Sequence, residues 1–253
     1  MDTTQQLFAE RLAPLGITLS ANQLKQFETY YKLLVEWNEK MNLTGITERE
    51  AVYEKHFYDS LTLVKAISFK EVSSLADIGS GAGFPSIPLA IAYPHLKVTI
   101  VDSLAKRIKF LEEVTSQLGL SLVTALHGRA EDVARLKAHR DQYDVVSARA
   151  VARLAVLNEF CLPFVRVGGT FVAMKGTDLS EEITESKYSI DKLNGKLVRV
   201  DQMKLPSDGA DRHLVIITKM SATPTIYPRK AGVPLKTPLV KPGNKPGSQS
   251  ITL

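Results

Sequence analysis

A glycine-rich turn between two apolar stretches constrains this chain more than any other feature. The segment Leu75-Ala-Asp-Ile-Gly-Ser-Gly-Ala-Gly-Phe-Pro-Ser-Ile-Pro-Leu-Ala-Ile91 predicts a short buried strand, a turn, and a helix that begins near Pro85. Gly79, Gly81 and Gly83 allow positive φ and a close approach of a ligand to the backbone. The helix directs free N–H groups and a partial positive charge toward the turn. This arrangement is typical of the cofactor site of a doubly wound α/β fold.

The spacing of the glycines separates two classes of cofactor. A dinucleotide site requires G-x-G-x-x-G after the strand, but Ser86 stands where the last glycine belongs. Read from Asp77, the pattern is D-x-G-x-G-x-G, which resembles motif I of the class I S-adenosylmethionine methyltransferases. The next predicted strand ends at Asp102, nineteen residues beyond Gly83, and a carboxylate there can accept both ribose hydroxyls. The sequence therefore favours a methyltransferase over a nicotinamide dehydrogenase or a merely tight turn.

Strand and helix signals alternate from residue 74 onward. The predicted strands cover residues 74–78, 97–102, 121–126, 143–147 and 169–174, and the predicted helices cover 86–93, 104–118, 130–137, 152–162 and 178–193. Such alternation predicts a parallel sheet with helices on both faces. Two further strands, 196–203 and 212–219, flank a turn composition that suits an antiparallel pair. We therefore expect a class I methyltransferase-like, doubly wound and mostly parallel seven-stranded sheet.

The chain is predicted to have three parts. Residues 1–68 form an N-terminal helical extension packed on the core, residues 69–220 form the methyltransferase domain, and residues 221–253 form a disordered tail. The clearest signal in the extension is an amphipathic helix after Ser20, with Gln23 completing a capping box. The tail holds six of the twelve prolines, no acidic residue and few large apolar residues, too few to offset its ordering entropy. It would be a solubility feature, a remnant of an expression vector or an electrostatic arm toward RNA.

The composition of the chain indicates the cellular compartment in which the protein is found. No apolar run approaches the ~20 residues of a membrane helix, and the N-terminus lacks the features of a signal peptide. The single cysteine, Cys161, lies in an apolar helical stretch, which fits a core residue in a reducing compartment. No Cys/His cluster has metal-ligand spacing. We expect a cytoplasmic, monomeric protein without a metal and without a membrane partner.

The loops after the first five strands are expected to meet at one edge of the sheet, where ligands bind. Beyond the glycine turn they contribute the acidic residues Glu131 and Asp132 and the cations Arg149, Arg153 and Lys175. Acidic residues also suit the first turn of a helix, and the cations can be solvated surface charges. Three cations at the rim of a cofactor site instead favour a nucleic-acid role for at least one of them. Upstream, His56 and Asp59 share a helix face, as a site pair, as a surface pair, or with the histidine packed under the domain.

The absence of certain sequence motifs limits the kinds of methyl acceptor that the protein can use. Residues 147–150 read Ser-Ala-Arg-Ala, which is not the Asn/Asp-Pro-Pro-aromatic motif of exocyclic-amine methyltransferases. One cysteine cannot supply the pair that attacks C6 of a pyrimidine to activate its C5. A phenol or alcohol acceptor would require a base or a metal near it. An acceptor with an available lone pair, such as guanine N7, requires none of these groups.

From about residue 20 to residue 219 the chain resembles the glucose-inhibited division protein B family, which are small-subunit ribosomal RNA guanine-N7 methyltransferases. The resemblance is carried by Asn42-Leu-Thr44, His56-Phe-Tyr-Asp-Ser60, the segment from Asp77 to Pro88, Val101-Asp-Ser103, Lys106-Arg107, Arg129-Ala-Glu131, Ser147-Ala-Arg-Ala150 and Met174-Lys-Gly176. It implies S-adenosylmethionine as the cofactor and small-subunit ribosomal RNA, or the small subunit itself, as the partner in a bacterial cytoplasm. It also implies cofactor contacts from Gly79, Phe84, residues 102–104, Ala130, Glu131 and Arg149.

These inferences combine into one predicted site. The expected cofactor-binding residues are Asp77, Gly79, Ser80, Gly81, Gly83, Phe84, Asp102, Ser103, Leu104, Ala130, Glu131 and Arg149. The candidates for positioning the acceptor are Arg149, Arg153, Lys175, His56 and Asp59, and no residue is assigned as an acid or a base. Two other classes remain open: a methyltransferase acting on a small molecule or a protein, and a non-catalytic RNA-binding protein with the same fold.

Overall fold

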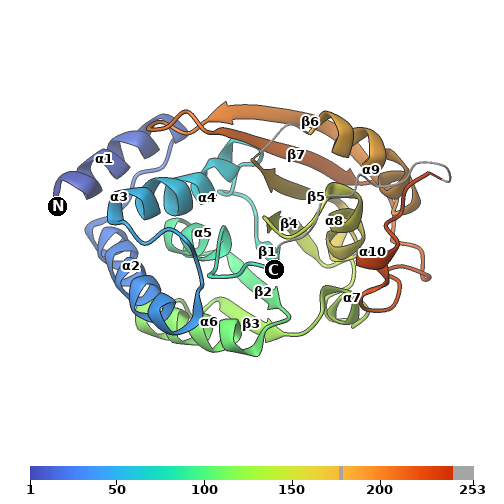
Figure 1. Ribbon diagram of the computed structural model, residues 1–253, viewed down its shortest axis with the longest axis horizontal. Coiled ribbons are helices and arrows are strands. Elements are labelled where there is room, and N and C mark those ends of the chain that lie inside the picture. Colours follow the sequence, from blue (N-terminus) through green and yellow to red (C-terminus); the bar gives the residue numbers. More distant parts are fainter. Residues whose placement is uncertain (177–178, 242–253) are drawn as a thin grey trace.

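A seven-stranded sheet forms the centre of the computed structural model, which describes residues 1–176 and 179–241 (Figure 1). The strands are β1 (Ser74–Ile78), β2 (Lys97–Asp102), β3 (Val123–His127), β4 (Tyr143–Arg149), β5 (Val165–Lys175), β6 (Gly195–Lys204) and β7 (Asp211–Lys219). Their order across the sheet is β3-β2-β1-β4-β5-β7-β6. The first five strands are parallel, whereas β7 runs antiparallel to both β5 and β6. The predicted α/β fold, with its closing antiparallel pair, is confirmed.

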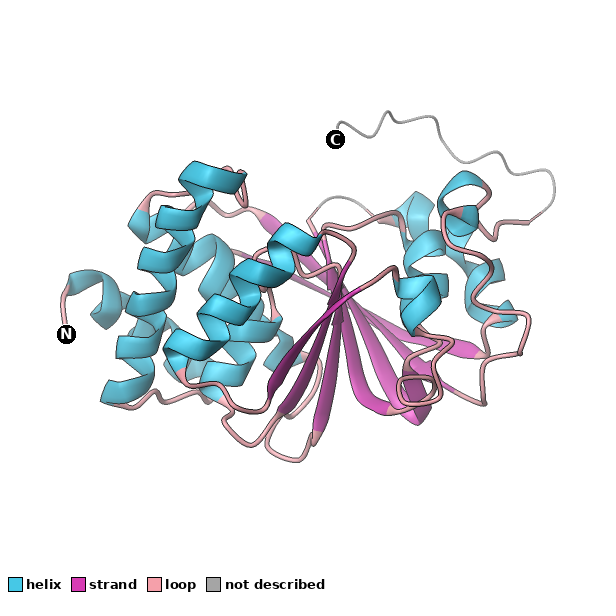
Figure 2. Cartoon of the chain, turned by 90° about the horizontal axis from the view of Figure 1, so that it is seen from below, coloured by secondary structure: helices cyan, strands magenta, loops and turns pink. Residues whose placement is uncertain are grey.

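Helices cover both faces of the sheet (Figure 2). Side chains of a strand alternate between faces, and in β1 Leu75 enters one core while Ala76 and Ile78 enter another. The first core is shared with α1 (Thr3–Leu12), α2 (Ala21–Met41), α5 (Ser86–Ala92) and α6 (Ala105–Leu118). The second is shared with α7 (Ala130–Val133), α8 (Leu154–Cys161) and α9 (Ser180–Lys192). The sheet is therefore buried between two helical layers.

The N-terminal helices pack on the sheet through aromatic residues. Ser20 and Gln23 form the expected capping box at the start of α2. A 3-10 turn (Ala13–Leu15) precedes α2. After α2 lie α3 (Arg49–Val52), a π-helical turn (Tyr53–Tyr58), α4 (Asp59–Leu61) and a second 3-10 turn (Thr62–Lys65). Phe57 in the π-helical turn is fully buried, and its ring lies 5.2 Å from the ring of Tyr30 in α2. The extension and the sheet thus share one hydrophobic core.

Residues 221–241, here called the C-terminal strap, pack against the sheet domain. Arg140 donates to the carbonyl oxygens of Thr223 at 2.8 Å and Tyr227 at 2.9 Å. Arg229 donates through Nε and Nη2 to the carboxylate of Glu159 in α8, at 3.0 and 2.7 Å. The short helix α10 (Val233–Lys236) follows and contacts α8 (Figure 1).

The strap contradicts the disorder predicted from residue 221. That prediction weighed the small number of large apolar side chains in the segment. The strap is instead held by arginines elsewhere in the chain, which bind its carbonyl oxygens, and by a buried ion pair. Composition does not reveal either interaction. Residues 242–253 lie outside the described residues, so the remainder of the predicted tail and the division of the chain at residues 68 and 220 stay predictions.

Most elements lie close to their predicted positions, with two clear differences. The strand predicted over 169–174 extends back to Val165, and the helix predicted over 130–137 is regular only to Val133. Cys161 is buried at the end of α8, in agreement with a core role. Within the described ranges, no helix has both the length and the apolar composition needed to cross a bilayer.

Candidate active site

The glycine turn lies between β1 and α5, at the edge of the sheet where the parallel strands end. Gly79 has a φ of +71°, and its N–H donates to the carbonyl oxygen of Val101 in β2 at 2.8 Å. A Cβ on Gly79 would lie 2.8 Å from Cγ2 of Val151. Position 79 therefore requires glycine for its left-handed backbone and for the lack of space beside it.

Gly83 is required for a different reason. Its φ is +98°, and a Cβ there would lie 2.6 Å from Cγ1 of Ile87 and 2.9 Å from the hydroxyl oxygen of Tyr30. The Tyr30 hydroxyl donates to the carbonyl oxygen of Ala82 at 2.5 Å. A residue of the N-terminal extension thus fixes the turn from outside the sheet domain.

Asp102 ends β2 and directs its carboxylate at the glycine turn. The residue is 2% exposed. Its Oδ2 accepts hydrogen bonds from the Gly81 N–H at 3.2 Å and from Arg107 Nη1 at 3.3 Å, and its Oδ1 accepts from the Leu104 N–H at 2.9 Å. A carboxylate has about four acceptor positions. Three donors therefore hold the group in place and leave it able to accept a further hydrogen bond.

A small cavity of about 130 Å³, here called the β3-side cavity, lies at the end of β2 and is lined by Val101 and Ser103, the residues on either side of Asp102. It is lined by four of the predicted cofactor residues, Gly79, Ser103, Ala130 and Glu131. Glu131 is 2% exposed, and its Oε1 accepts a hydrogen bond from the N–H of Gly232 in the strap at 2.8 Å. Leu235, also from the strap, forms part of the cavity wall. This cavity therefore combines residues of the sheet edge with residues of the strap.

A larger cavity of about 450 Å³, here called the β5-side cavity, contains most of the candidates for positioning an acceptor. It is lined by His56, Asp59, Arg149 and Lys175, and also by Arg212 from β7. The Asp59 carboxylate accepts from Arg149 Nη1 at 3.0 Å and from Arg212 Nε at 3.2 Å. The guanidinium carbon of Arg149 lies 4.8 Å from the centre of the Phe84 ring. The N-terminal extension, β4 and β7 are thus tied together around one carboxylate.

Three consecutive residues take part in both cavities. Arg149 and Ala150 line the β5-side cavity, and Val151 lines the β3-side cavity. Ala150 has a φ of +56°, a left-handed conformation that is uncommon for alanine. Such conformations are enriched at functional sites, where the surrounding structure imposes them.

His56 is held in its neutral form inside the β5-side cavity. Burial, followed by the positive charge of Arg149, lowers the pKa of His56 to about 3. Its ring stacks on Phe84 at 4.5 Å, and its Nε2 lies 2.8 Å from Oγ1 of Thr44. His56 therefore presents an uncharged aromatic plane at physiological pH.

Asp77 lies beneath the glycine turn and is fully buried. Its carboxylate accepts from the N–H of Ser86 at 3.3 Å and from Oγ of Ser147 at 3.2 Å, which joins the start of α5 to β4. Burial raises the pKa of Asp77 to about 7, although these two hydrogen bonds act in the opposite direction. The Asp77 side chain therefore stabilises the glycine turn from the buried side.

The three cations predicted at the rim are not equivalent. Arg149 and Lys175 line the β5-side cavity, but Lys175 Nζ also binds Glu182 Oε2 at 2.8 Å and the Ala152 carbonyl oxygen at 2.9 Å. Arg153 lines neither of the two cavities and donates to Glu185 at 2.8 Å. The expected convergence of all three is wrong, because acidic residues of α9 bind two of them.

The lining residues that the sequence analysis did not name include Val151, Arg212 and Leu235. Arg212 was missed because residues 212–219 were predicted to pair only with residues 196–203. In the structure β7 also pairs with β5, where His213 lies opposite Lys175 and places Arg212 at the end of β5. No pattern in the sequence marks Val151. Leu235 was missed because it lies in the segment predicted to be disordered.

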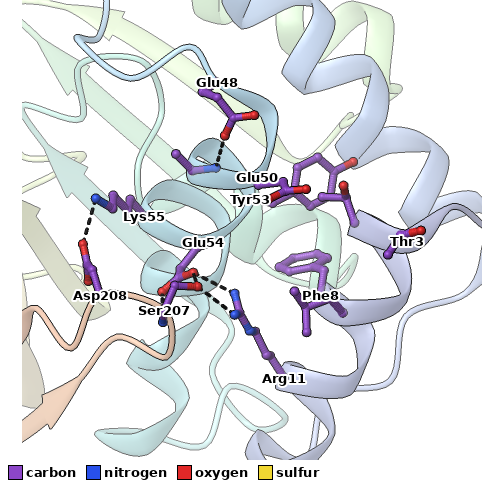
Figure 3. Close-up of a pocket in the computed structure, with 13 residues that line it drawn as sticks. Thr3, Phe8, Arg11, Glu48, Glu50, Tyr53, Glu54, Lys55, Ser207 and Asp208 are labelled. Atoms are coloured by element: carbon purple, nitrogen blue, oxygen red, sulfur yellow. Dashed lines mark hydrogen bonds and ion pairs between the residues drawn. The ribbon is translucent and has the colours of Figure 1, made fainter.

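A third cavity, of about 300 Å³, lies between α1, the π-helical turn and the β6–β7 connection (Figure 3). Glu54 there is 4% exposed and accepts from Arg11 Nη1 at 2.7 Å and from the N–H of Ser207 at 2.6 Å. Of the described residues, none from the glycine turn lines this cavity. Its polar groups bind one another, so the region joins the first helix to the hairpin and is structural.

The residues around the glycine turn fit S-adenosylmethionine. The hydroxyl oxygen of Ser80 is buried, and none of the described residues forms a hydrogen bond with it. Buried polar atoms normally have a partner, which a polar ligand in the turn would provide. The Asp102 carboxylate faces the same turn and keeps an acceptor position that a ligand hydroxyl can use.

Comparison with known proteins assigns the chain to a family. The sequence profile of the GidB family, described as rRNA small subunit methyltransferase G, matches residues 23–215. Ribosomal RNA small subunit methyltransferase G of Brevibacillus brevis is 55% identical over 237 residues, covering 94% of this chain and 100% of that protein. The protein of the same name from Halalkalibacterium halodurans is 55% identical over 232 residues, covering 92% and 98%.

Solved structures show the same fold at low identity. Protein Atu636 of Agrobacterium tumefaciens, described as a predicted O-methyltransferase, has a TM-score of 0.50 and 17% identity, covering 61% of this chain and 77% of that chain. This likeness concerns the fold alone. The family match spans most of the chain and confirms the resemblance found in the sequence. The chain belongs to the GidB family of ribosomal RNA small subunit methyltransferases G.

Proposed function

We propose that this protein transfers a methyl group from S-adenosylmethionine to N7 of a guanine in small-subunit ribosomal RNA. Family membership supports the reaction class, and one structural observation carries the proposal for this site. Three consecutive residues contribute to both cavities: Arg149 and Ala150 line the β5-side cavity, and Val151 lines the β3-side cavity. The β3-side cavity lies beside the glycine turn and the end of β2, and the β5-side cavity is lined by cations. Binding of a cofactor and a base in these two cavities would bring them together at residues 149–151.

The β3-side cavity and the glycine turn are the proposed cofactor site. The cofactor supplies an electrophilic methyl group, and the chain supplies binding and orientation. We assign the ribose hydroxyls to Asp102, the amino acid end to the turn around Ser80 and Gly81, and the purine to Ala130 and Glu131. Asp77 and Gly83 are enclosed by protein atoms, so they shape the turn rather than contact the ligand.

The β5-side cavity is the proposed site for the guanine. Arginine commonly binds both O6 and N7 of guanine, but N7 must remain free to attack the methyl group. Arg149, Arg212 or Lys175 would therefore bind O6 or a backbone phosphate. The neutral ring of His56, which lines this cavity and is backed by the buried ring of Phe84, offers an uncharged plane in the same place. The guanine has to be unstacked to enter, as in a single-stranded loop.

The reaction at N7 explains the absence of an assigned general base. The N7 lone pair attacks directly, and the product keeps every ring proton. Positive charge moves onto the guanine ring, so a charged histidine beside it would be unfavourable. The low pKa of His56, caused by burial and by Arg149, keeps that ring neutral. Asp59 is already bound by two arginines and fixes their positions.

Methyl transfer from labelled S-adenosylmethionine tests the proposal. The purified protein is incubated with small subunits, with free small-subunit ribosomal RNA, and with large-subunit RNA as a control. We expect label only in small-subunit RNA, recovered as 7-methylguanosine in a nucleoside digest. Label in a protein or a small molecule, or RNA binding without transfer, would overturn the proposal. The expectations of a cytoplasmic location and a monomeric state remain predictions.

Replacing Asp102 with alanine is expected to weaken S-adenosylmethionine binding by roughly 5- to 150-fold. Loss of an acceptor for a buried donor typically costs ~1–3 kcal/mol, and each 1.4 kcal/mol is a factor of ten. Calorimetric titration measures the affinity. Asp132→Ala is the matched control, because Asp132 is an exposed acid at the same edge of the sheet. Equal affinity for S-adenosylmethionine in wild type and Asp102→Ala would show that Asp102 does not bind the cofactor.

Arg149→Ala is expected to lower kcat by roughly 10-fold, because it removes a charged donor to Asp59 and a contact with Phe84. Arg153→Ala serves as the control. Its ion pairs with α9 are partly exposed and are worth only about 0–1 kcal/mol to stability. Urea unfolding of both variants separates misfolding from a loss of turnover. Equal kcat for the two variants would contradict a role for Arg149 in the acceptor site.

A further inference from the structure

The strap is anchored to α8 by an ion pair between its Arg229 and the buried carboxylate of Glu159. Glu159 in α8 is fully buried. Arg229 binds it through its backbone N–H at 2.7 Å and through Nε and Nη2 at 3.0 and 2.7 Å. A buried carboxylate without a partner is strongly unfavourable. The position of the strap at α8 is therefore set by the body of the protein.

Further anchors lie on both sides of this ion pair. Arg135 and Arg140, which follow α7, bind carbonyl oxygens in the first half of the strap. Beyond Arg229, the same guanidinium donates to the carbonyl oxygen of Thr237 at 2.8 Å, which closes residues 229–237 into a loop. The strap therefore holds this loop against α7 and α8.

The loop of the strap reaches the proposed cofactor site at two points. The N–H of Gly232 donates to Glu131 Oε1 at 2.8 Å, which leaves Oε2 able to accept a hydrogen bond from a ligand. Leu235 lines the β3-side cavity together with Ser103 and Ala130. Leu235 is also 41% exposed, so an apolar side chain at the cavity wall remains partly accessible to solvent. Ligand sites in proteins typically bury most of the ligand surface behind apolar walls.

We propose that the strap forms the outer wall of the nucleoside end of the cofactor site, with Leu235 against the purine and Gly232 orienting Glu131. This inference rests on the proposed function. Since Asp102 at the end of β2 is placed for the ribose, the purine lies toward β3 and α7, which is where the strap closes the cavity. Residues far outside the glycine turn thus contribute to cofactor affinity.

Calorimetric titration of Leu235→Ala tests the wall directly. We use S-adenosylmethionine and 5′-methylthioadenosine, which keeps the nucleoside and lacks the amino acid end. Loss of apolar contact is expected to weaken both ligands equally, by about 10-fold. Leu122→Ala is the matched control, because Leu122 is 42% exposed and lies outside the β3-side cavity. Its affinities should equal those of the wild type.

Other outcomes overturn the proposal in distinguishable ways. Unchanged binding in Leu235→Ala would show that the strap does not touch the ligand, and tighter binding would show that it blocks the cavity. Weaker binding of S-adenosylmethionine alone would place the contact away from the nucleoside. If wild type binds neither ligand, the proposed function fails as well. As a second readout on the unmodified protein, S-adenosylmethionine should slow hydrogen exchange at residues 230–237.

Discussion

Gly79→Val is expected to reduce S-adenosylmethionine affinity by more than about 100-fold. The added Cβ would lie 2.8 Å from Val151 and, at a φ of +71°, the backbone disfavours any side chain. Overpacking a filled site typically costs ~1–3 kcal/mol, and here the valine methyl groups also enter the space proposed for the ligand. Titration with S-adenosylmethionine gives the affinity, and urea unfolding gives the stability of the same sample.

Gly119→Val is the matched control for backbone strain. Gly119 ends α6 with a φ of +67°, and a Cβ there would meet nothing within 4 Å. Both variants should lose about 1–2 kcal/mol of unfolding free energy for placing an L-residue in the left-handed region. Gly79→Val should lose more than Gly119→Val, because it also overpacks the contact with Val151. Only Gly79→Val should lose affinity. If both variants bind S-adenosylmethionine as tightly as wild type, the cofactor does not lie at the glycine turn.

Asp77→Asn and His56→Gln are expected to change the pH dependence of stability in opposite directions. Burial raises the pKa of Asp77 to about 7, so the folded protein holds an extra proton and the free energy of unfolding falls as pH rises from about 4 to 7. Burial and Arg149 lower the pKa of His56 to about 3, so the stability that depends on neutral His56 is lost as pH falls from about 6.5 to 3. Each contribution is worth up to ~5 kcal/mol, at ~1.4 kcal/mol per pKa unit.

Urea unfolding from pH 4 to pH 7 compares the two variants with wild type. Relative to wild type, Asp77→Asn should gain stability as pH rises, because it no longer carries a carboxylate that must ionise inside the core. His56→Gln should lose stability relative to wild type over the same range. A constant difference from wild type at every pH, for either variant, would show that the group titrates as it does in the unfolded chain.

The elements that carry local signals were predictable from sequence. Glycine spacing and the strand-end carboxylate of Asp102 depend on short-range backbone geometry, and strand–helix alternation fixes a parallel sheet. The same locality explains why Ser20 and Gln23 were recognised as a capping box. The residues that form each of these features are close together in the sequence, so the features can be predicted from a single sequence.

Features that depend on contacts between distant residues were not predictable. Asp59 and Arg212 are 153 positions apart and meet only because β7 lies beside β5. The ion pair between Glu159 and Arg229 orders a segment whose composition is typical of disorder. Arg153 was misassigned because the acidic residues that bind it lie on α9, a later helix.

The hydrogen bond from Tyr30 to Ala82 has a consequence for the order of folding. The glycine turn is held in part by this hydrogen bond from α2, and Leu235 of the strap completes the wall of the β3-side cavity. Contacts of such long sequence separation form late, after the entropy of closing large loops has been overcome. A nascent chain still attached at its C-terminus would therefore have a complete sheet but an open cavity, and cofactor affinity would mature last.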